Sequence, residues 1–151
     1  MRICSLKRWS PDQGGAAVEF TFIAVMLVVV MVGIVEMGRM VLVYTTVANA
    51  ARAGARYAIV HGADRSTGTG VNGVSGPGST TQVKTVVTDF ASAGLLDTTK
   101  LNIAVNYPNG LNTPDSPVTV TVTYPYDAWV PYFRSLLSVT LGSTSEGIIT
   151  F

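Results

Sequence analysis

The longest apolar run of the chain lies near its start. Residues 20–35 are sixteen positions without a charged side chain. The small residues before Glu19 extend this weakly polar stretch to about 20 positions, or about 30 Å as a helix, which is enough to cross a bilayer. A carboxylate close to the start of such a run is costly in lipid, so Glu19 requires an interfacial position or a positive partner. The pattern predicts a transmembrane helix over residues 15–36.

Two charged residues, Glu36 and Arg39, follow the apolar run. Their i,i+3 spacing on a helix would allow an ion pair. They are expected to mark the outer boundary of the membrane segment, and pairing between subunits is the alternative. No proline lies between Asp12 and Val60, so residues 37–61 should continue the helix outside the membrane. A helix from Ala16 to Val60 would be about 65–70 Å long, far more than a bilayer needs.

The outer half of this predicted helix has a stripe of small residues. Such a stripe lets another element approach closely, whereas the arginines on a neighbouring stripe should face water or a carboxylate of the domain. Ligand binding by these arginines is the alternative. The expected packing residues are Ala48, Ala51 and Ala55, with Tyr44 and Ala58 on the same stripe, Gly54 beside it, and Arg52 and Arg56 alongside.

A polar connection and a second helix should come next. Residues 62–81 are rich in Gly, Ser and Thr and contain almost no apolar residue, which is typical of a flexible surface loop. Apolar residues then recur at helical spacing from Val83 to Ala91, and Gly94 is suited to the C′ position that ends a helix. The pattern predicts a short amphipathic helix.

The C-terminal part has the alternation of β-strands. Residues 101–107 and 118–124 alternate apolar and polar side chains, as half-buried strands do. The segment from Pro108 to Pro117 contains Asn109-Gly110 and predicts the turn of an antiparallel hairpin. Residues 82–151 should therefore form a small α+β domain.

Further β-prone residues follow an aromatic cluster. Segments 138–141 and 148–151 are interrupted by Gly142 and Gly147 and predict one broken strand or two short ones. The cluster is expected in the core, with a partner-binding patch as the alternative. Its members are Tyr126, Trp129, Tyr132 and Phe133.

These elements predict an α+β protein. A long N-terminal transmembrane helix should extend into a small extracytoplasmic domain with a second helix and a small antiparallel sheet. The apolar face of such a sheet needs a cover, and the outer half of the first helix is the obvious candidate.

Charge sets the expected orientation. The net charge of the 151-residue chain is +1, and only 13% of residues are charged, so no basic surface for nucleic acid is implied. The basic residues Arg2, Lys7 and Arg8 precede the apolar run. Flanks of this kind are retained on the cytoplasmic side, so the N-terminus should stay in the cytoplasm.

Catalytic chemistry has little support in the sequence. His61 is the only histidine and adjoins a Gly/Ser loop, which does not supply the rigid site that a catalytic triad needs. The glycines from Gly68 to Gly78 lack the Lys-Ser/Thr of a phosphate-binding loop. Cys4 is the only cysteine and no Cys/His cluster indicates a metal; a cation bound by scattered carboxylates is the alternative. We expect no enzyme, no metal and no other cofactor.

Three stretches carry a resemblance to a known family. The first is Gly14-Gly15-Ala16-Ala17-Val18-Glu19-Phe20 at the start of the apolar helix, which looks like the processing site of type IV pilin-like precursors. The others are residues 33–39, GIVEMGR, and 49–58, NAARAGARYA. In this order and spacing, the three resemble the TadE-like pseudopilins of the tight-adherence (Flp) pilus system, whose domains are pilin-like.

The resemblance implies how the precursor matures. A prepilin peptidase would cut between Gly14 and Gly15 on the cytoplasmic face and remove a leader of residues 1–14. Glu19 would become the fifth residue of the mature chain. The new amine of a neighbouring subunit could neutralise Glu19 when helices pack side by side. Phe20, where the major pilin has tyrosine, fits the pseudopilin branch.

The implied function is that of a minor pseudopilin. It would be a single-pass protein of the bacterial inner membrane that helps to assemble a Tad pilus or related secretion machine. Its partners would be the prepilin peptidase, other pilins or pseudopilins and the Tad secretion platform. The alternative is an uncleaved, membrane-anchored binding module such as an adhesin or sensor domain. The motif itself also has a simpler interpretation, in which Gly14-Gly15 breaks the structure before a helix and Glu19 favours the helix N-terminus.

Overall fold

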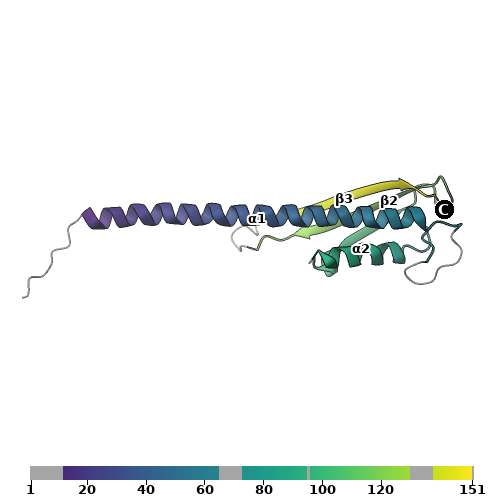
Figure 1. Ribbon diagram of the computed structural model, residues 1–151, viewed down its shortest axis with the longest axis horizontal. Coiled ribbons are helices and arrows are strands. Elements are labelled where there is room, and N and C mark those ends of the chain that lie inside the picture. Colours follow the sequence, from purple (N-terminus) through teal and green to yellow (C-terminus); the bar gives the residue numbers. More distant parts are fainter. Residues whose placement is uncertain (1–11, 65–72, 95, 130–137, 151) are drawn as a thin grey trace, which may run out of the picture. The chain divides into compact units, whose positions relative to one another are not determined.

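The fold is α+β, as the sequence predicts. The computed structural model describes residues 12–64, 73–94, 96–129 and 138–150, and the chain divides into two compact units, residues 1–38 and 39–151. Figure 1 shows a long first helix, a second helix and a small antiparallel sheet. In chain order the elements are α1 (Asp12–Val60), α2 (Thr81–Ala93), the short 3-10 helix η2 (Thr98–Lys100), β1 (Asn102–Asn106), β2 (Pro117–Tyr126) and β3 (Val139–Ile148).

The first unit contains the apolar part of α1. Its Ala, Val, Leu, Ile and Met side chains favour or tolerate a helix that satisfies every backbone group internally, and no proline interrupts it. Helix α1 begins at Asp12, so Gly14 and Gly15 lie inside the helix, and the interpretation that they break the structure before it is wrong. In the part of the chain that the structure describes, Gly14–Val60 is long and apolar enough to cross a membrane, and none of its most apolar window is buried.

The core of the second unit joins α1, α2 and the sheet. Small residues of α1 and valines of α2 pack against the valines of β2, so the outer half of the first helix covers the sheet, as expected. The fully or almost fully buried residues of this core include Val47, Ala50, Ala51, Ala55 and Ala58 of α1, Val83 and Val87 of α2, and Val118, Val120 and Val122 of β2.

The face of α1 that enters this core is slightly rotated from the predicted stripe. Tyr44 is half exposed (50%), whereas Val47, Ala50 and Gly54 are buried. Gly54 lies in the middle of the packed face, because a Cβ there would overlap the Val87 side chain and would lie 3.3 Å from Val120 Cγ1. A close approach of α1 and α2 therefore occurs at a residue that the sequence pattern placed only beside the stripe.

The sheet has the order β1-β2-β3 and is antiparallel throughout. Strand β1 pairs with β2 in a register that places Ile103 opposite Val122 and Val105 opposite Val120. Both side chains of each pair point to the face that the helices cover, because alternate residues of a strand share one face. The predicted hairpin is confirmed, and its connection contains Gly110 at φ 64°.

The third strand is continuous rather than broken or split. All ten residues of β3 pair with β2, with Gly142 opposite Thr123 and Gly147 opposite Val118. A Cβ at Gly147 would overlap the Ile59 side chain of α1, and its distance to Ile59 Cγ1 would be only 2.8 Å. This glycine therefore marks a close approach of helix and strand instead of a strand end.

A bulge lies just before β2. The Asp115 N–H donates to the Ile149 carbonyl (2.9 Å), and the Ile149 N–H donates to the Ser116 carbonyl (3.0 Å). Two residues on one strand therefore oppose one on the other, and Asp115 has φ 68°. This is the geometry of a bulge whose first residue is left-handed, a position that glycine or aspartate tolerates best.

Helix α2 ends next to Gly94, as predicted, and Gly94 is the C-cap residue rather than the C′ residue. Gly94 has φ −82°, and its N–H donates to the carbonyls of Phe90 (3.3 Å) and Ala91 (3.1 Å). A Cβ at Gly94 would overlap the Thr46 side chain of α1. Close packing of two helices, rather than backbone conformation, requires glycine at this position.

The residues of the predicted aromatic cluster differ in burial. Tyr126 is 1% exposed, as expected of a core residue, but Trp129 is 80% exposed, so its expected place in the core is wrong. Tyr132 and Phe133 lie outside the described residues, as do residues 65–72 of the predicted loop.

Candidate functional site

The predicted processing segment lies on the exposed surface of α1 in the first unit. Residues 14–20 are all exposed, and a Cβ built at Gly14 or Gly15 would meet no atom within 4 Å. Glu19 has no ion pair within the part of the chain that the structure describes. A positive partner for Glu19 would have to come from another molecule or from residues beyond that part.

The surface that continues from this segment is apolar. Phe20, Phe22 and Met26 are 73%, 76% and 66% exposed. The one hydroxyl nearby, on Thr21, donates to the Ala17 carbonyl one turn earlier (2.8 Å) and is satisfied within the helix. This surface has the properties required for contact with lipid or with another apolar helix.

Glu36 and Arg39, the predicted membrane-boundary pair, have different surroundings. Glu36 is 8% exposed. The Arg39 guanidinium donates from Nη2 to the Asp127 carbonyl (2.8 Å), and its Cζ lies 5.1 Å from the centroid of the Tyr126 ring. Arg39 is therefore oriented by the end of β2, and its pairing with Glu36 stays a prediction.

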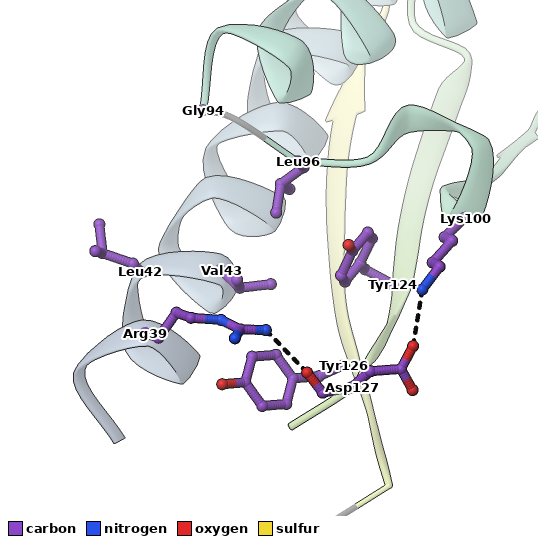
Figure 2. A pocket seen from close by; sticks show the side chains of 9 residues that line it. All are labelled: Arg39, Leu42, Val43, Gly94, Leu96, Lys100, Tyr124, Tyr126 and Asp127. Atoms are coloured by element: carbon purple, nitrogen blue, oxygen red, sulfur yellow. Dashed lines mark hydrogen bonds and ion pairs between the residues drawn. The ribbon is translucent and has the colours of Figure 1, made fainter. Parts of the chain in front are cut away.

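Arg39 lines a cleft of about 470 Å³ within the second unit (Figure 2). Helix α1, the segment after α2, η2 and the end of β2 each contribute side chains to it. Val43, Leu96 and Tyr124 contribute apolar surface, and Figure 2 shows Arg39 on one side of the cleft, Lys100 on the other and Asp127 between them. The lining residues are Arg39, Leu42, Val43, Gly94, Leu96, Lys100, Tyr124, Tyr126 and Asp127.

The charged groups of this cleft converge on Asp127. Its carbonyl accepts from Arg39 (2.8 Å), and its carboxylate pairs with the Lys100 ammonium (2.8 Å). Both side chains of the Lys100–Asp127 pair are nearly half exposed, at 44% and 45%, so the pair contributes little stability and is easily rearranged. The hydrogen bond to Asp127, followed by the negative charge of that carboxylate, raises the pKa of Lys100. Lys100 is therefore positive at any physiological pH.

The short helix η2 positions Lys100. Asp97 caps this helix, since its carboxylate accepts from the Thr99 hydroxyl (2.6 Å) and the Thr99 N–H (3.1 Å). These two hydrogen bonds, the hydroxyl first, lower the pKa of Asp97. The turn that carries Lys100 is therefore ordered by a carboxylate that stays ionised.

Sequence reasoning did not find this cleft. Lys100, Tyr124 and Asp127 come from separate segments and meet only because β2 pairs with its neighbours and η2 closes over its end. The one available signal was the pair Tyr124 and Tyr126 on alternate positions of a strand end.

The predicted packing residues of α1 occupy two environments. Ala51 and Ala55 are buried at 0% and 2% exposure, and Ala48 is half-buried. Arg52 and Arg56 are exposed, and Arg52 donates to Asn49 Oδ1 (3.3 Å). The alanines thus face the domain, and the arginines face outward.

The contacts of His61 hold the end of α1 against the segment at Ser75. Its ring stacks on Tyr57 with centroids 3.9 Å apart, and Nδ1 lies 3.0 Å from the Tyr57 carbonyl. Its own carbonyl accepts from the N–H (2.7 Å) and the hydroxyl (3.1 Å) of Ser75. Within the described ranges, no group of three or more His, Cys, Asp or Glu is placed to hold a metal ion.

One buried side-chain oxygen among the described residues has no hydrogen-bond partner. Tyr107 is 6% exposed, and its hydroxyl makes no hydrogen bond within the described residues. Burial raises the pKa of Tyr107, an effect that the nearby Ser75 hydroxyl partly offsets. The Ser75 hydroxyl donates to the His61 carbonyl, and its oxygen lies near the Tyr107 hydroxyl without the geometry of a hydrogen bond.

Fold and site together define a class of protein. It has an N-terminal apolar helix suited to membrane anchoring, and that helix enters the core of a small α+β domain. The sequence model of the TadE-like protein family matches residues 14–56, so the resemblance to TadE-like proteins of the Tad pilus system is confirmed over that segment. The match covers the N-terminal helix and stops before the rest of the domain. No curated protein and no solved structure matches the chain.

Proposed function

We propose that the chain is a minor pseudopilin of a Tad pilus or a related secretion machine. The observation that carries this proposal is the TadE-like match, which covers the start of the helix, the apolar segment and the part of α1 that packs against the sheet. The protein acts as a structural component of assembly.

The proposed first step is removal of the leader. A prepilin peptidase cuts between Gly14 and Gly15 on the cytoplasmic face. The exposed glycines support this step, because no side chain of the described residues lies within 4 Å of either Cβ position. Cleavage leaves the anchor attached and creates a new amine on Gly15.

The proposed second step is packing of the anchor against other pilin-like helices. The mature helix crosses the inner membrane once, with its start in the cytoplasm and residues 39–151 outside the cell membrane. Glu19, which has no ion pair in the described part of its own chain, receives the amine of a neighbouring subunit. A carboxylate in a low-dielectric medium requires such a positive partner, because leaving it unpaired there is costly.

N-terminal sequencing of protein recovered from membranes tests the first step. In cells that contain a prepilin peptidase, the mature chain should begin at Gly15, and in cells without it at Met1. A chain that begins at Met1 in both strains would contradict the proposal.

A second candidate function is an uncleaved, membrane-anchored binding module. The cleft of about 470 Å³ near Arg39 favours it, because a cavity of this size can hold a small molecule. This candidate requires an intact leader in every strain, so the same sequencing experiment separates the two.

A further inference from the structure

The cleft near Arg39 has the chemistry of an anion site at the level of a membrane surface. We propose that it binds the headgroup of an anionic phospholipid, a monoanionic phosphodiester such as that of phosphatidylglycerol. The inference rests on the membrane anchoring in the proposed function. It adds a ligand for the second unit that neither the processing site nor the apolar helix requires.

Chain continuity places Arg39, one of the residues that line the cleft, close to the headgroup layer. Arg39 is the third residue after Glu36, the expected end of the membrane segment, so it lies about 4.5 Å farther along α1 at 1.5 Å per residue. The headgroup layer on each side of a bilayer is about 5–8 Å thick. A side chain at position 39 therefore reaches the phosphates and not the acyl chains.

The charges of the lining suit one negative ligand. Arg39 and Lys100 contribute two positive charges and Asp127 one negative charge, which leaves a net charge of +1. Arg39 uses one N–H on the Asp127 carbonyl, and a guanidinium has five in a planar array that matches phosphate oxygens. Among the described residues, the Lys100 ammonium pairs with the half-exposed Asp127 carboxylate, so a phosphate can share it without leaving a buried charge unpaired.

The remaining surface of the cleft suits the rest of a lipid headgroup. Val43 and Leu96 form an apolar wall beside the cations, and Leu42 at the rim is 68% exposed. Trp129, two residues beyond Asp127, is 80% exposed. Exposed tryptophan and tyrosine are typical of protein surfaces at the membrane interface, where the ring is in contact with both lipid and water.

Lipid binding by the full chain in detergent micelles tests the inference. Native mass spectrometry would compare phosphatidylglycerol with zwitterionic phosphatidylcholine. One net positive charge near a headgroup is expected to favour the anionic lipid by about fivefold. The double variant Arg39→Gln, Lys100→Gln leaves Asp127 as the one charge of the lining, so it should lose the preference for phosphatidylglycerol and favour phosphatidylcholine. Lys84→Gln, which removes an exposed cation on α2 away from the cleft, should keep the preference.

A substitution of opposite sign separates binding from misfolding. Asp127→Asn removes the one negative charge of the lining and leaves the backbone carbonyl that orients Arg39. It should increase the preference for phosphatidylglycerol, whereas a variant that only damaged the fold would decrease it. No preference in the wild type, or an unchanged preference in the double variant, would overturn the inference.

A soluble competitor identifies the source of the phosphate. An excess of glycerophosphoglycerol, the soluble phosphodiester that remains when the acyl chains are removed, should displace little bound phosphatidylglycerol, because the apolar wall and the membrane plane favour the lipid. Equal binding of the soluble ester would overturn the lipid assignment. Cleavage at Gly14 does not enter this measurement, so failure here leaves the proposed function intact.

Discussion

Gly54 of α1 faces Val87 of α2 so closely that a Cβ on residue 54 would overlap the Val87 Cγ2 atom. The same Cβ would lie 3.3 Å from Val120 Cγ1 and 3.4 Å from Val83 Cγ1. Three buried valines from α2 and β2 thus meet the backbone of α1 at one point. Gly54 sets the distance at which the long helix packs on the rest of the domain.

We predict that Gly54→Ala destabilises the domain by about 1–3 kcal/mol, since an added methyl group in a closely packed core forces its neighbours apart. The gain in helix propensity, about 0.5–1 kcal/mol, offsets part of this cost. Gly38→Ala is the matched control, because it is on the same helix and its Cβ would meet nothing within 4 Å. Thermal unfolding of both variants in detergent, followed by circular dichroism, measures the difference. Equal melting temperatures would show that the packing at Gly54 can relax.

Hydrophobic periodicity predicted most of the fold. It gave the extent of α1, the helix from Val83 to Ala91 and the β1–β2 hairpin, because each has one buried face and a regular pattern along it. It failed at β3, where Gly142 and Gly147 looked like interruptions. Pairing with β2 and the close approach of Ile59 explain these glycines, and neither is visible in a local pattern.

The two candidate sites also differ in how far the sequence could predict them. The processing motif is contiguous in sequence, so residues 14–20 could be identified without a structure. The cleft could not, because Lys100 and Asp127 are 27 residues apart in sequence and meet only through the path of β2. Trp129 was expected in the core because aromatic residues usually are buried, yet it is exposed.

Two tyrosines should respond in opposite ways to loss of the hydroxyl. The Tyr107 hydroxyl is buried without a hydrogen bond in the described chain, so Tyr107→Phe should raise the free energy of unfolding by about 1 kcal/mol. The Tyr57 hydroxyl donates to the Gly73 carbonyl (2.8 Å), so Tyr57→Phe should lower it by about 1 kcal/mol. Urea unfolding of the two variants gives both signs. A loss of stability in Tyr107→Phe would indicate a partner for that hydroxyl.

The free energy of unfolding at alkaline pH provides a separate test of the burial of Tyr107. Burial raises its pKa above the ordinary value of 10.0, so the folded state binds the proton more tightly than the unfolded state. The contribution of Tyr107 is therefore constant below pH 10 and is lost as the pH rises from 10 through the folded pKa. Above pH 10 the stability of Tyr107→Phe should fall less steeply than that of the wild type. Parallel profiles would contradict the assigned burial effect.

Removal of the covering helix should unfold the domain. A fragment of residues 39–151 retains α1 from Arg39 onward, including the buried Val47, Ala51 and Ala58. A fragment that begins at Gly62 loses these residues and exposes the apolar face of the sheet. The first fragment should give a cooperative melt and resist limited proteolysis, and the second should do neither. A stable fragment from Gly62 would instead favour the stand-alone binding module.

Processing and assembly should respond to different residues of the exposed segment. Gly14→Ala places a methyl group next to the proposed cleavage point and should leave uncut precursor in membranes. Glu19→Ala should be cut normally and fail in assembly, because the carboxylate that would receive a neighbour's amine is gone. Immunoblots of membrane fractions measure cutting, and electron microscopy of pili measures assembly. Glu146→Ala, which removes an exposed carboxylate of β3, is the control and should change neither.

The Glu19 variants also decide whether charge or shape matters. Glu19→Gln preserves the size of the side chain and removes its charge, so an ion pair with the amine of a neighbouring Gly15 predicts the same loss of pili as Glu19→Ala. The domain should stay folded in both variants, because the described residues give Glu19 no ion pair to lose. Normal pili in the Glu19→Gln strain would mean that the residue acts through packing, and normal pili in the Glu19→Ala strain would remove the helix-pairing argument altogether.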